Sequence, residues 1–430
     1  MKPAGRLQAA IEVLEQVLER HQPASLALAE WGRAHRFAGS GDRAAIGNLV
    51  FDALRHKSSI AARMDADTPR VLALGAVAFV WREAPEAVAA LCDGSQHAPA
   101  PLADAERRGL ETLLPADTPA HVRGDFPEWL TPSLERAFGG RAAQEGAALA
   151  RRAPVDLRSN PVKAGRDKVL KGLAKFGAVP TPLSPLGVRV APPGKDRRSP
   201  HLEADPAHGK GWFEVQDEGS QLAALLAGAR PGMQVADLCA GSGGKTLALA
   251  CAMENRGQIY AYDADAQRLR PIFERLKRAG IRNAQVLRPG EPEGLAALED
   301  KMDLVVVDAP CTGSGTWRRR PDAKWRLKPA MLEERLKEQR AVLDLAAPLV
   351  KPGGRLAYIT CSVLPEENTD QVTAFLERHP GFALVPFNDA WREALHAAPP
   401  VSSDGREDTL LLTPASHGTD GFFVAILARN

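Results

Sequence analysis

Two cysteines, Cys311 and Cys361, each come shortly after an apolar run that is typical of a buried strand. These runs cover residues 304–307 and 356–359, and residues 329–349 between them have the pattern of a helix. A strand, a crossover helix and a second parallel strand bring both strand ends to one edge of a sheet. If the strands are neighbours, their ends lie about 5 Å apart, and the two thiols could act on one substrate. The alternative for either cysteine alone is a small buried core residue.

Two neighbouring thiols suit methyl transfer to carbon 5 of a pyrimidine, an atom that is a poor nucleophile. A thiolate that adds to carbon 6 turns the ring into an enamine, whose carbon 5 can attack a sulfonium methyl group. The proton at carbon 5 must then leave, and the thiolate must be expelled. Because a free thiol with a pKa of about 8.5 is only slightly ionised at neutral pH, the site must help it ionise.

Asp308 precedes Cys311 by three residues, at the end of the same predicted strand. Its carboxylate could hydrogen-bond the ring and stabilise the protonated intermediate. The alternative is an ordinary acid in the turn after a strand.

A glycine-rich loop follows a predicted strand and opens a predicted helix; it consists of Cys239, Ala240, Gly241, Ser242, Gly243, Gly244 and Lys245. A phosphate-binding P-loop would need glycine at Cys239, and the dinucleotide fingerprint would need glycine at Thr246. Asp263 ends the next strand, 22 residues after Gly241, and an acid at this distance suits ribose hydroxyl groups. S-adenosylmethionine (AdoMet), which has a ribose but no phosphate, fits both features. The alternative is a structural glycine turn with a surface acid.

The elements that must position these residues alternate along the second half of the chain. Strands are predicted at residues 234–238, 258–262, 284–287, 304–307, 355–360 and 421–427, with helices between them. This alternation predicts an α/β fold with a parallel, doubly wound sheet. Ligands bind such sheets at the carboxyl ends of the strands, near the point where strand order reverses.

The first half of the chain is different. Leu7, Ile11, Leu14 and Leu18 recur at helical spacing, and Ser40-Gly41-Asp42 marks the start of another helix. From residue 127 to about 193 the pattern is mixed, with helices predicted at 132–152 and 164–176 and a strand at 187–190, which indicates a small α+β unit. Residues 192–210 predict a polar linker or a mobile loop. We therefore predict three segments: a helical domain at 1–130, the α+β subdomain with its linker at 131–205, and the α/β domain at 206–430.

The composition is that of a globular protein. With 430 residues, the chain is long enough for two or three domains. Its content of 44% hydrophobic and 25% charged residues is typical of globular proteins. The net charge of only +2 excludes few classes of binding partner. None of the five cysteines falls in a CxxC pair, so we expect no structural metal and a reducing, cytoplasmic location. We expect no signal peptide and no membrane span, because no run approaches about 20 apolar residues.

The catalytic half of the chain resembles the Nop/Sun family of RNA cytosine-5 methyltransferases. The resemblance rests on the paired cysteine motifs together with several flanking motifs. These are Gln216-Asp217-Glu218-Gly219-Ser220-Gln221, the Gly241 loop, residues 308–311 and 319–325, Thr360-Cys361-Ser362, Pro365-Glu366-Glu367-Asn368 and His417-Gly418-Thr419-Asp420-Gly421-Phe422-Phe423.

The resemblance implies a role for each candidate residue. The family's Thr-Cys cysteine is the nucleophile, which corresponds to Cys361, and its Pro-Cys cysteine, which assists product release, corresponds to Cys311. The cofactor loop corresponds to residues 239–245 and the ribose-binding acid to Asp263. The motif aspartate before Ala-Pro-Cys corresponds to Asp308, which we also expect near the cofactor, AdoMet.

The accessory regions resemble those of the bacterial RsmB (Sun/Fmu) branch of the family. Residues 42–55 are similar to its helical NusB-type domain, and residues 154–190 to its small RNA-recognition-like subdomain. Members of this branch methylate a cytosine in small-subunit ribosomal RNA, so the resemblance implies an RNA partner and the same substrate class here.

The chain departs from the family pattern in two places. The loop commonly reads Cys-Ala-Ala-Pro-Gly-Gly-Lys-Thr in the family, and here Gly241-Ser242 replaces Ala-Pro, which should change loop stiffness more than chemistry. An acid usually follows the third strand and faces the adenine, whereas Arg288-Pro289-Gly290 stands there in this chain. Another group, such as the Glu291 carboxylate, would then have to make that contact.

A basic run follows the Cys311 loop and is interleaved with Trp317 and Trp325. Its cations are Arg318, Arg319, Arg320, Lys324, Arg326 and Lys328. Phosphate neutralisation supplies much nucleic-acid affinity, and aromatic or guanidinium planes stack extruded bases. We therefore predict RNA contacts from Arg318, Arg319, Arg320 and Lys324, the alternative being a solvated charged face.

Three rival functions fit the sequence less well. A DNA cytosine-5 methyltransferase would use the Pro-Cys cysteine as nucleophile, and the Thr360-Cys361 site argues against it. An amino-group methyltransferase would carry Pro-Pro-Tyr or Pro-Pro-Phe after Asp308, where this chain has Ala-Pro-Cys. A non-catalytic ribosome-assembly factor would not need both cysteines, the glycine loop and Asp263, and loss of AdoMet binding would favour it.

Overall fold

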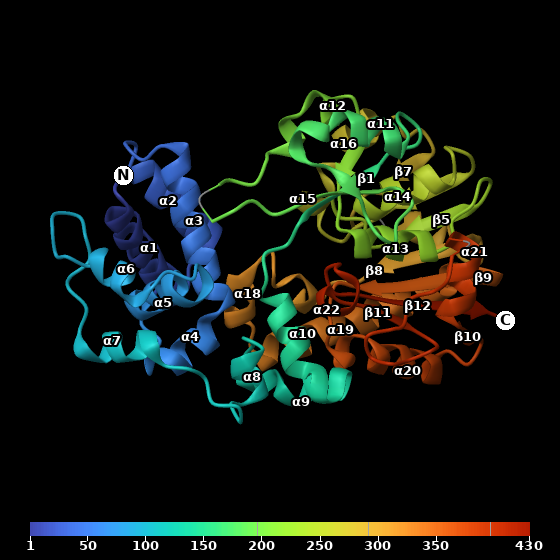
Figure 1. Cartoon of the computed structure of the whole chain (residues 1–430). Coiled ribbons are helices and arrows are strands. Elements are labelled where there is room, and N and C mark those ends of the chain that lie inside the picture. Colours follow the sequence, from blue (N-terminus) through green and yellow to red (C-terminus); the bar gives the residue numbers. More distant parts are fainter. Residues whose placement is uncertain (196, 291, 396) are drawn as a thin grey trace. The chain divides into compact units, whose positions relative to one another are not determined.

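The computed structural model describes all residues except 196, 291 and 396. The described chain forms two compact units (Figure 1). The helical unit consists of Met1–Arg152, Pro192–Ser199 and Trp317–Leu327, and the sheet unit of Ala153–Ala191, Pro200–Thr316 and Lys328–Asn430. This division differs from the three consecutive segments that we predicted, because two short segments from later in the chain fold with the N-terminal helices.

The helical unit is built from short helices around one apolar core. They are α1 (Pro3–Leu18), α2 (Ala24–Ala34), α3 (Ser40–Arg55), α4 (Lys57–Met64), α5 (Pro69–Gly75), α6 (Pro85–Ala90), α7 (Asp104–Glu111), α8 (Ala120–Arg123), α9 (Thr131–Phe138) and α10 (Ala142–Leu149). Leu7, Ile11 and Leu14 of α1 are buried, as their spacing predicts. At the start of α3, the Asp42 carboxylate accepts the backbone N–H of Gly39, which satisfies one of the donors that a helix start leaves open.

The segment Trp317–Leu327 completes this core. Trp325, on the short helix α18 (Pro321–Arg326), packs against the apolar cluster, and its indole Nε1 donates to the carbonyl of Leu54 at 2.6 Å. The Arg55 guanidinium donates to the carbonyl of Arg318 at 2.9 and 3.2 Å. Hydrogen bonds that span more than 260 residues of sequence therefore hold this segment in the helical unit.

The sheet unit contains an eight-stranded sheet in the order β10-β12-β9-β8-β5-β6-β7, with β11 paired to β12. The strands are β5 (Gln234–Asp237), β6 (Gln258–Ala261), β7 (Ala284–Val286), β8 (Met302–Asp308), β9 (Val350–Thr360), β10 (Phe382–Val385), β11 (Leu410–Leu412) and β12 (Phe422–Arg429). The five strands β5 to β9 pair in parallel, and β12 runs antiparallel to β9. The order reverses between β5 and β8, as expected for a doubly wound sheet.

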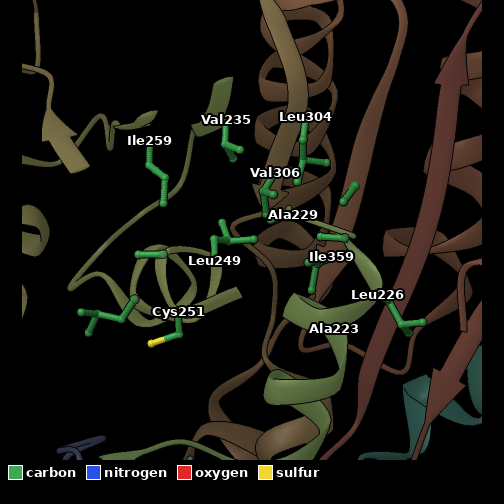
Figure 2. Packing of buried hydrophobic residues seen from close by; sticks show 14 of the residues in the cluster. Ala223, Leu226, Ala229, Val235, Leu249, Cys251, Ile259, Leu304, Val306 and Ile359 are labelled. Atoms are coloured by element: carbon green, nitrogen blue, oxygen red, sulfur yellow. The ribbon is translucent and has the colours of Figure 1, made fainter. Parts of the chain in front are cut away.

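Helices cover this sheet and close its core. They are α13 (Glu218–Leu226), α14 (Gly244–Ala252), α15 (Ala266–Leu269), α16 (Ile272–Ala279), α17 (Pro292–Ala296), α19 (Pro329–Ala346), α20 (Thr369–Arg378), α21 (Phe387–Leu395) and α22 (Pro414–His417). Figure 2 shows Val235 and Val306 of the central strands near Leu249 of α14. Because both faces of the sheet are covered at its centre, strand β8 carries an unbroken buried apolar run at residues 304–307.

A second, four-stranded sheet lies within the sheet unit. Its order is β2 (Val179–Pro180), β3 (Gly187–Val190), β1 (Val155–Ser159) and β4 (Phe213–Val215), all antiparallel. With α11 (Arg166–Gly172) it has its own small apolar cluster. The predicted α+β pattern is present. Within the residues predicted to be linker, Pro206–Gly209 form α12, and β4 comes from residues that we assigned to the α/β domain.

No helix among the described residues combines the length and the apolar character that crossing a membrane requires.

Candidate active site

The predicted site residues meet at one edge of the large sheet. Asp237 ends β5, Asp308 ends β8, and Asp263 follows β6 by two residues. Cys311 and Cys361 follow β8 and β9. Because these four strands are parallel, all five side chains come from the carboxyl ends, at the reversal of strand order.

The two cysteine sulfur atoms lie 3.4 Å apart. Strands β8 and β9 pair directly, as predicted, with Asp308 opposite Ile359 in the register. The backbone N–H of Gly315 also donates to the carbonyl of Cys361 at 3.0 Å, which ties the two loops together. The hydrogen bond with Cys361 and burial raise the pKa of the Cys311 thiol well above its usual range. At neutral pH Cys311 is therefore a thiol while Cys361 stands beside it.

Glu367 receives hydrogen bonds from both cysteine loops. Its Oε1 accepts the backbone N–H of Thr312 at 2.7 Å and Nε2 of Gln339 at 3.0 Å. Its Oε2 accepts the hydroxyl groups of Thr312 and Ser362. Burial raises the pKa of Glu367 above the usual value, although these donors oppose the shift. One side chain thus fixes the residue after Cys311 and the residue after Cys361.

A second set of hydrogen bonds orders the Cys361 loop. Thr360 Oγ1 donates to Asn368 Oδ1 at 2.6 Å, and Asn368 Nδ2 donates to the carbonyl of Ser362 at 3.0 Å. The backbone N–H of Val363 donates to Ser314 Oγ at 2.9 Å. The residues on both sides of Cys361 are buried and hydrogen-bonded, so the position of its sulfur is set by its neighbours.

The glycine loop needs its glycines for conformation and for space. Gly241 and Gly243 have φ of +51° and +89°, which side-chain-bearing residues rarely adopt. A Cβ at Gly243 would lie 2.6 Å from Ile272 Cγ1, so a side chain there would clash with α16. The backbone N–H of Gly241 donates to Asp263 Oδ2 at 2.9 Å, which links the loop to the end of β6.

Two arginines hold the same loop. Arg158 on β1 donates to the carbonyl of Gly244 at 3.0 Å. Arg275 on α16, which is ion-paired with Glu214, donates to the carbonyl and to Oγ of Ser242 at 2.9 and 2.7 Å. The serine that departs from the family pattern thus gains a side-chain hydrogen bond that proline could not make. Sequence reasoning found neither arginine, since both lie outside the motif.

Lys245 lies between the loop and Asp308. Its Nζ donates to Ser220 Oγ at 2.9 Å and to Asp308 Oδ2 at 3.1 Å, and it stands 5.1 Å from the centre of the Phe422 ring. Only 4% of the Lys245 side chain is exposed, whereas 33% of the Asp308 side chain is. The lysine orients a carboxylate that remains accessible from solvent.

Asp237, the last residue of β5 before the glycine loop, is fully buried. Its Oδ2 accepts the hydroxyl of Thr246 at 2.7 Å, and its Oδ1 has no partner among the described residues. Burial raises the pKa of Asp237 to about 7, and the charges of Asp308 and Asp263 act in the same direction.

The residues at this edge fit AdoMet. Each oxygen of Asp263 accepts one backbone N–H, from Gly241 and Asp265. A carboxylate has about four acceptor positions, so two remain for ribose hydroxyl groups. A Cβ at Gly241 would lie 3.8 Å from Asp263 Oδ2, and glycine leaves that approach open. The contact to adenine stays a prediction, because Glu291 lies outside the described residues.

The basic run after the Cys311 loop is only partly exposed. Lys324 is 1% exposed, and its Nζ donates to the carbonyls of Arg55, at 3.0 Å, and of Asp125. The prediction of an RNA phosphate contact from Lys324 is therefore wrong, since its charge is used inside the helical unit. Arg318 is also buried, at 4% exposure, whereas Arg319 is half-buried and Arg320 is exposed.

Among the described residues, no three histidine, cysteine, aspartate or glutamate side chains are grouped as a metal site.

The sheet order, the single antiparallel strand beside β9, the glycine turn after β5 and the acid after β6 define a class I AdoMet-dependent methyltransferase domain.

Comparisons with known proteins agree with this class. The profile of a family described as 16S rRNA methyltransferase RsmB/F matches residues 224–428. A protein named probable ribosomal RNA small subunit methyltransferase B, from Synechocystis sp., is 33% identical over 329 residues, which are 76% of this chain and 71% of that protein. The Salmonella typhi ribosomal RNA small subunit methyltransferase B is 35% identical over 65% of this chain and 64% of its own length.

Solved structures are similar as well. The crystal structure of PH0851 covers 99% of both chains with a TM-score of 0.73 and 26% identity. A methyltransferase homologue from Pyrococcus horikoshii covers 74% of this chain and 100% of its own, with a TM-score of 0.60 and 28% identity. The chain belongs to the RsmB/F family of methyltransferases, and AdoMet is its cofactor.

Sequence reasoning missed Glu367 and Gln339 as parts of the site. Glu367 stands in the quoted motif Pro365-Glu366-Glu367-Asn368, but no role was assigned to it. An acidic residue close behind a nucleophile motif was the signal that could have found it. Gln339 lies in the middle of α19 and carries no such signal.

Proposed function

We propose that the protein transfers a methyl group from AdoMet to carbon 5 of a cytosine in RNA, through a covalent intermediate on Cys361. The observation that carries this proposal is the 3.4 Å distance between the sulfurs of Cys361 and Cys311, beside the accessible carboxylate of Asp308. The substrate class follows from relatives that are named for small-subunit ribosomal RNA, so 16S rRNA is the proposed substrate.

The first step is addition of the Cys361 thiolate to carbon 6 of the cytosine. Asp308, oriented by Lys245, hydrogen-bonds the ring and stabilises its protonated form. When bound, AdoMet supplies an electrophilic methyl group for carbon 5. Residues 239–245 and Asp263, which are joined by the hydrogen bond from the Gly241 N–H, would hold it, and the Asp263 carboxylate would accept hydrogen bonds from the ribose.

Cys311 acts in the last step, which is release of the product. Its thiol has a raised pKa first because of the hydrogen bond with Cys361. Once Cys361 is bonded to carbon 6, that hydrogen bond and any thiolate charge on Cys361 are gone. Cys311 then ionises more readily and can take the proton from carbon 5, after which the Cys361 thiolate leaves. The pair therefore works in sequence, since two adjacent thiolates would repel each other.

The accessory parts would bind RNA. We propose that the helical unit is a NusB-like RNA- or protein-binding unit, and that Arg319 and Arg320 contact phosphates. The small sheet with β1 and β3 would be the RNA-recognition-like subdomain. A cytoplasmic location is proposed on the same grounds, and the five free cysteines are compatible with it.

A denaturing gel for covalent RNA–protein adducts tests this proposal. Cys311→Ala should accumulate a slow-migrating, RNase-sensitive adduct with cellular RNA and AdoMet, because its release step is blocked. The double variant Cys311→Ala/Cys361→Ala should give none. Cys311→Ala/Cys92→Ala is the matched control: Cys92 is buried in the helical unit, so the adduct should remain. Sequencing the trapped RNA would name the target.

Two outcomes would contradict the proposal. An adduct that persists without Cys361 would reverse the roles of the two cysteines. No adduct in any variant, together with no AdoMet binding by calorimetry, would favour the assembly-factor alternative.

A further inference from the structure

A pocket of about 400 Å³ lies within the helical unit, and neither Cys311 nor Cys361 belongs to this unit. Its lining includes Trp81, Arg151, Arg152 and Lys195. The lining belongs entirely to Met1–Arg152 and Pro192–Ser199, so it is complete within this unit. The volume falls in the range of about 300–1,000 Å³ that is typical of small-ligand sites.

Trp81 forms a fixed aromatic wall of this pocket. Its indole Nε1 donates to Asp52 Oδ2 at 2.8 Å. Asp52 is 1% exposed and is itself held by Arg55 at 3.0 Å and by both sides of the Arg152 guanidinium. Burial works against ionisation of Asp52, but the bonds and charge of Arg152 hold its pKa below the usual value. The tryptophan ring is thus oriented by a buried carboxylate whose ionised form is stabilised by Arg152.

The backbone that presents Trp81 is unusual. A π-helical turn over Ala76–Val80 precedes it, and the Trp81 N–H donates to the carbonyl of Ala76 at 3.0 Å. Such turns are rare and are frequently found at functional sites. Arg82 follows with a φ of +59°, a conformation that costs energy in a non-glycine residue. The partly exposed Trp81 ring thus lines the pocket, and a strained residue directly follows it in the chain.

Among the described residues that line the pocket, three are cations (Arg151, Arg152 and Lys195) and one, Asp52, is an acid. Arg151 is exposed, and Lys195 Nζ stands 5.7 Å from the centre of the Trp81 ring. Arg152 forms an ion pair with Asp52, the acid that lines the pocket. Lys195 forms an ion pair with Glu83, and the side chains of both residues are partly exposed. Within the part of the chain that the structure describes, the exposed Arg151 side chain makes no ion pair, so its charge is available to a ligand.

We propose that this pocket binds one nucleotide of the RNA substrate, outside the methylated cytosine. The base stacks on Trp81, and Arg151 and Lys195 contact its phosphates. A flat ring and a cation at its edge suit an unpaired nucleotide, whose base is free to stack and whose phosphate carries a negative charge. The inference rests on the proposed function, because it takes the substrate to be RNA.

Photo-crosslinking with the full-length protein locates the contact directly. Single-stranded RNA that contains 4-thiouridine should crosslink to the peptide that carries Trp81, as identified by mass spectrometry. Trp81→Leu should abolish this crosslink and weaken RNA binding about 5- to 150-fold, the range for loss of one stacked base. Trp81→Phe keeps a ring without the Nε1 hydrogen bond and should restore most of the binding.

The cations give a second, independent readout. Arg151→Ala/Lys195→Ala should lower RNA affinity in fluorescence anisotropy and reduce the slope of log affinity against log salt by about one to two units. The matched control is Arg33→Ala, an exposed arginine of α2 that does not line the pocket, which should leave the slope unchanged. Equal effects in the pocket variant and the control, or no crosslink at the Trp81 peptide, would overturn the proposal.

The adduct assay separates this inference from the proposed function. If Cys311→Ala traps RNA and the pocket variants bind RNA as tightly as the wild type, the function stands and the pocket does not bind RNA. If no adduct forms but the pocket variants lose RNA affinity, the pocket stands without the methyl transfer. A crosslink to protein partners instead of RNA would also refute the nucleotide proposal.

Discussion

Two fully buried ionisable side chains, Lys324 in the helical unit and Glu367 in the sheet unit, are alike in almost every local property. Each is at most 1% exposed, and each has several hydrogen-bond partners. Burial shifts the pKa of each toward the neutral form, upward for Glu367 and down to about 8 for Lys324. Neither burial nor the pKa shift tells them apart.

Their partners do. Lys324 donates to the carbonyls of Arg55 and Asp125, which lie 269 and 199 residues away in the sequence, and so it ties three segments of one core. Glu367 binds the residues that follow Cys311 and Cys361. A perturbed buried group is a candidate for function only when its partners are themselves chemical groups of a site. The comparison predicts that one group mainly supports stability and the other activity.

The largest expected effect is that of Glu367→Gln on methylation. A glutamine would place an amide N–H2 against the donors of Thr312, Ser362 or Gln339, and at least one buried donor would lose its acceptor. Displacement of the Cys311 loop should lower kcat by about 100-fold or more, since small misplacements of reacting groups have effects of that size. Methyl incorporation from labelled AdoMet is the measurement, and Glu377→Gln, on the exposed face of α20, is the isosteric control. Activity near the wild type would remove Glu367 from the site.

The next effect is that of Lys324→Met on stability. The substitution leaves the carbonyls of Arg55 and Asp125 without a donor, at about 1–3 kcal/mol for each unsatisfied group. The free energy of unfolding of the helical unit should therefore fall by about 2–6 kcal/mol. Urea unfolding followed by tryptophan fluorescence reports this unit, which holds Trp31, Trp81, Trp129, Trp317 and Trp325 of the seven tryptophans. A large loss of RNA affinity with unchanged stability would reverse the comparison.

The pH dependence of stability should differ in sign between the two units. The folded pKa of Lys324, about 8, lies below its ordinary 10.5, so its contribution to stability is present above pH 10.5 and is lost as pH falls to 8. The folded pKa of Asp237, about 7, lies above 3.8, so its contribution is present below pH 3.8 and is lost as pH rises to 7. Each slope should reach at most about 1.4 kcal/mol per pH unit.

Difference curves isolate each group. In urea unfolding, the free energy of unfolding of the wild type minus that of Lys324→Met should rise between pH 8 and 10. The free energy of unfolding of the wild type minus that of Asp237→Asn should fall between pH 4 and 7. A flat difference curve would show that the group keeps its ordinary pKa in the folded state.

The smallest expected effect is that of Arg320→Ala. This arginine is exposed in the same short segment as buried Lys324. Loss of one phosphate contact should weaken RNA binding a few-fold and reduce the salt slope by about one unit, with no change in stability. Anisotropy titrations at several salt concentrations would measure it, with Arg33→Ala again as the control. An unchanged salt slope would remove Arg320 from the proposed RNA surface.

The features that depend on local pattern could be predicted from the sequence. The six predicted strands are present, and the pairing of β8 with β9 follows from their apolar runs and the helix between them. The short strands β10 and β11 were missed, since three or four apolar residues are too few for a periodic signal. The helix predicted from residue 132 is broken at Gly139, whose φ of +55° ends α9.

Features that depend on distant contacts could not be predicted. The segment Trp317–Leu327 has the charge and aromatic pattern of an RNA-binding strip, and only its contacts with Leu54, Arg55 and Asp125 place it in the helical core. No local pattern encodes partners that lie about 200 residues or more away. For Glu367 the sequence offers one local signal, its place close behind the Cys361 motif, but its contacts with Thr312 and Gln339, 55 and 28 residues away, could not be predicted from that motif.

The short distance between the Cys311 and Cys361 sulfurs also makes the protein sensitive to oxidation. The S–S distance in a disulfide is about 2.05 Å, so closing the 3.4 Å gap requires only a small displacement of the two loops. A peroxide that takes two electrons and two protons from the pair would remove both of the thiols to which we assign the proposed attack and release steps. A thiol reductant would restore both. Preparations kept without reductant should therefore lose methylation and recover it on treatment with dithiothreitol, whatever RNA is offered.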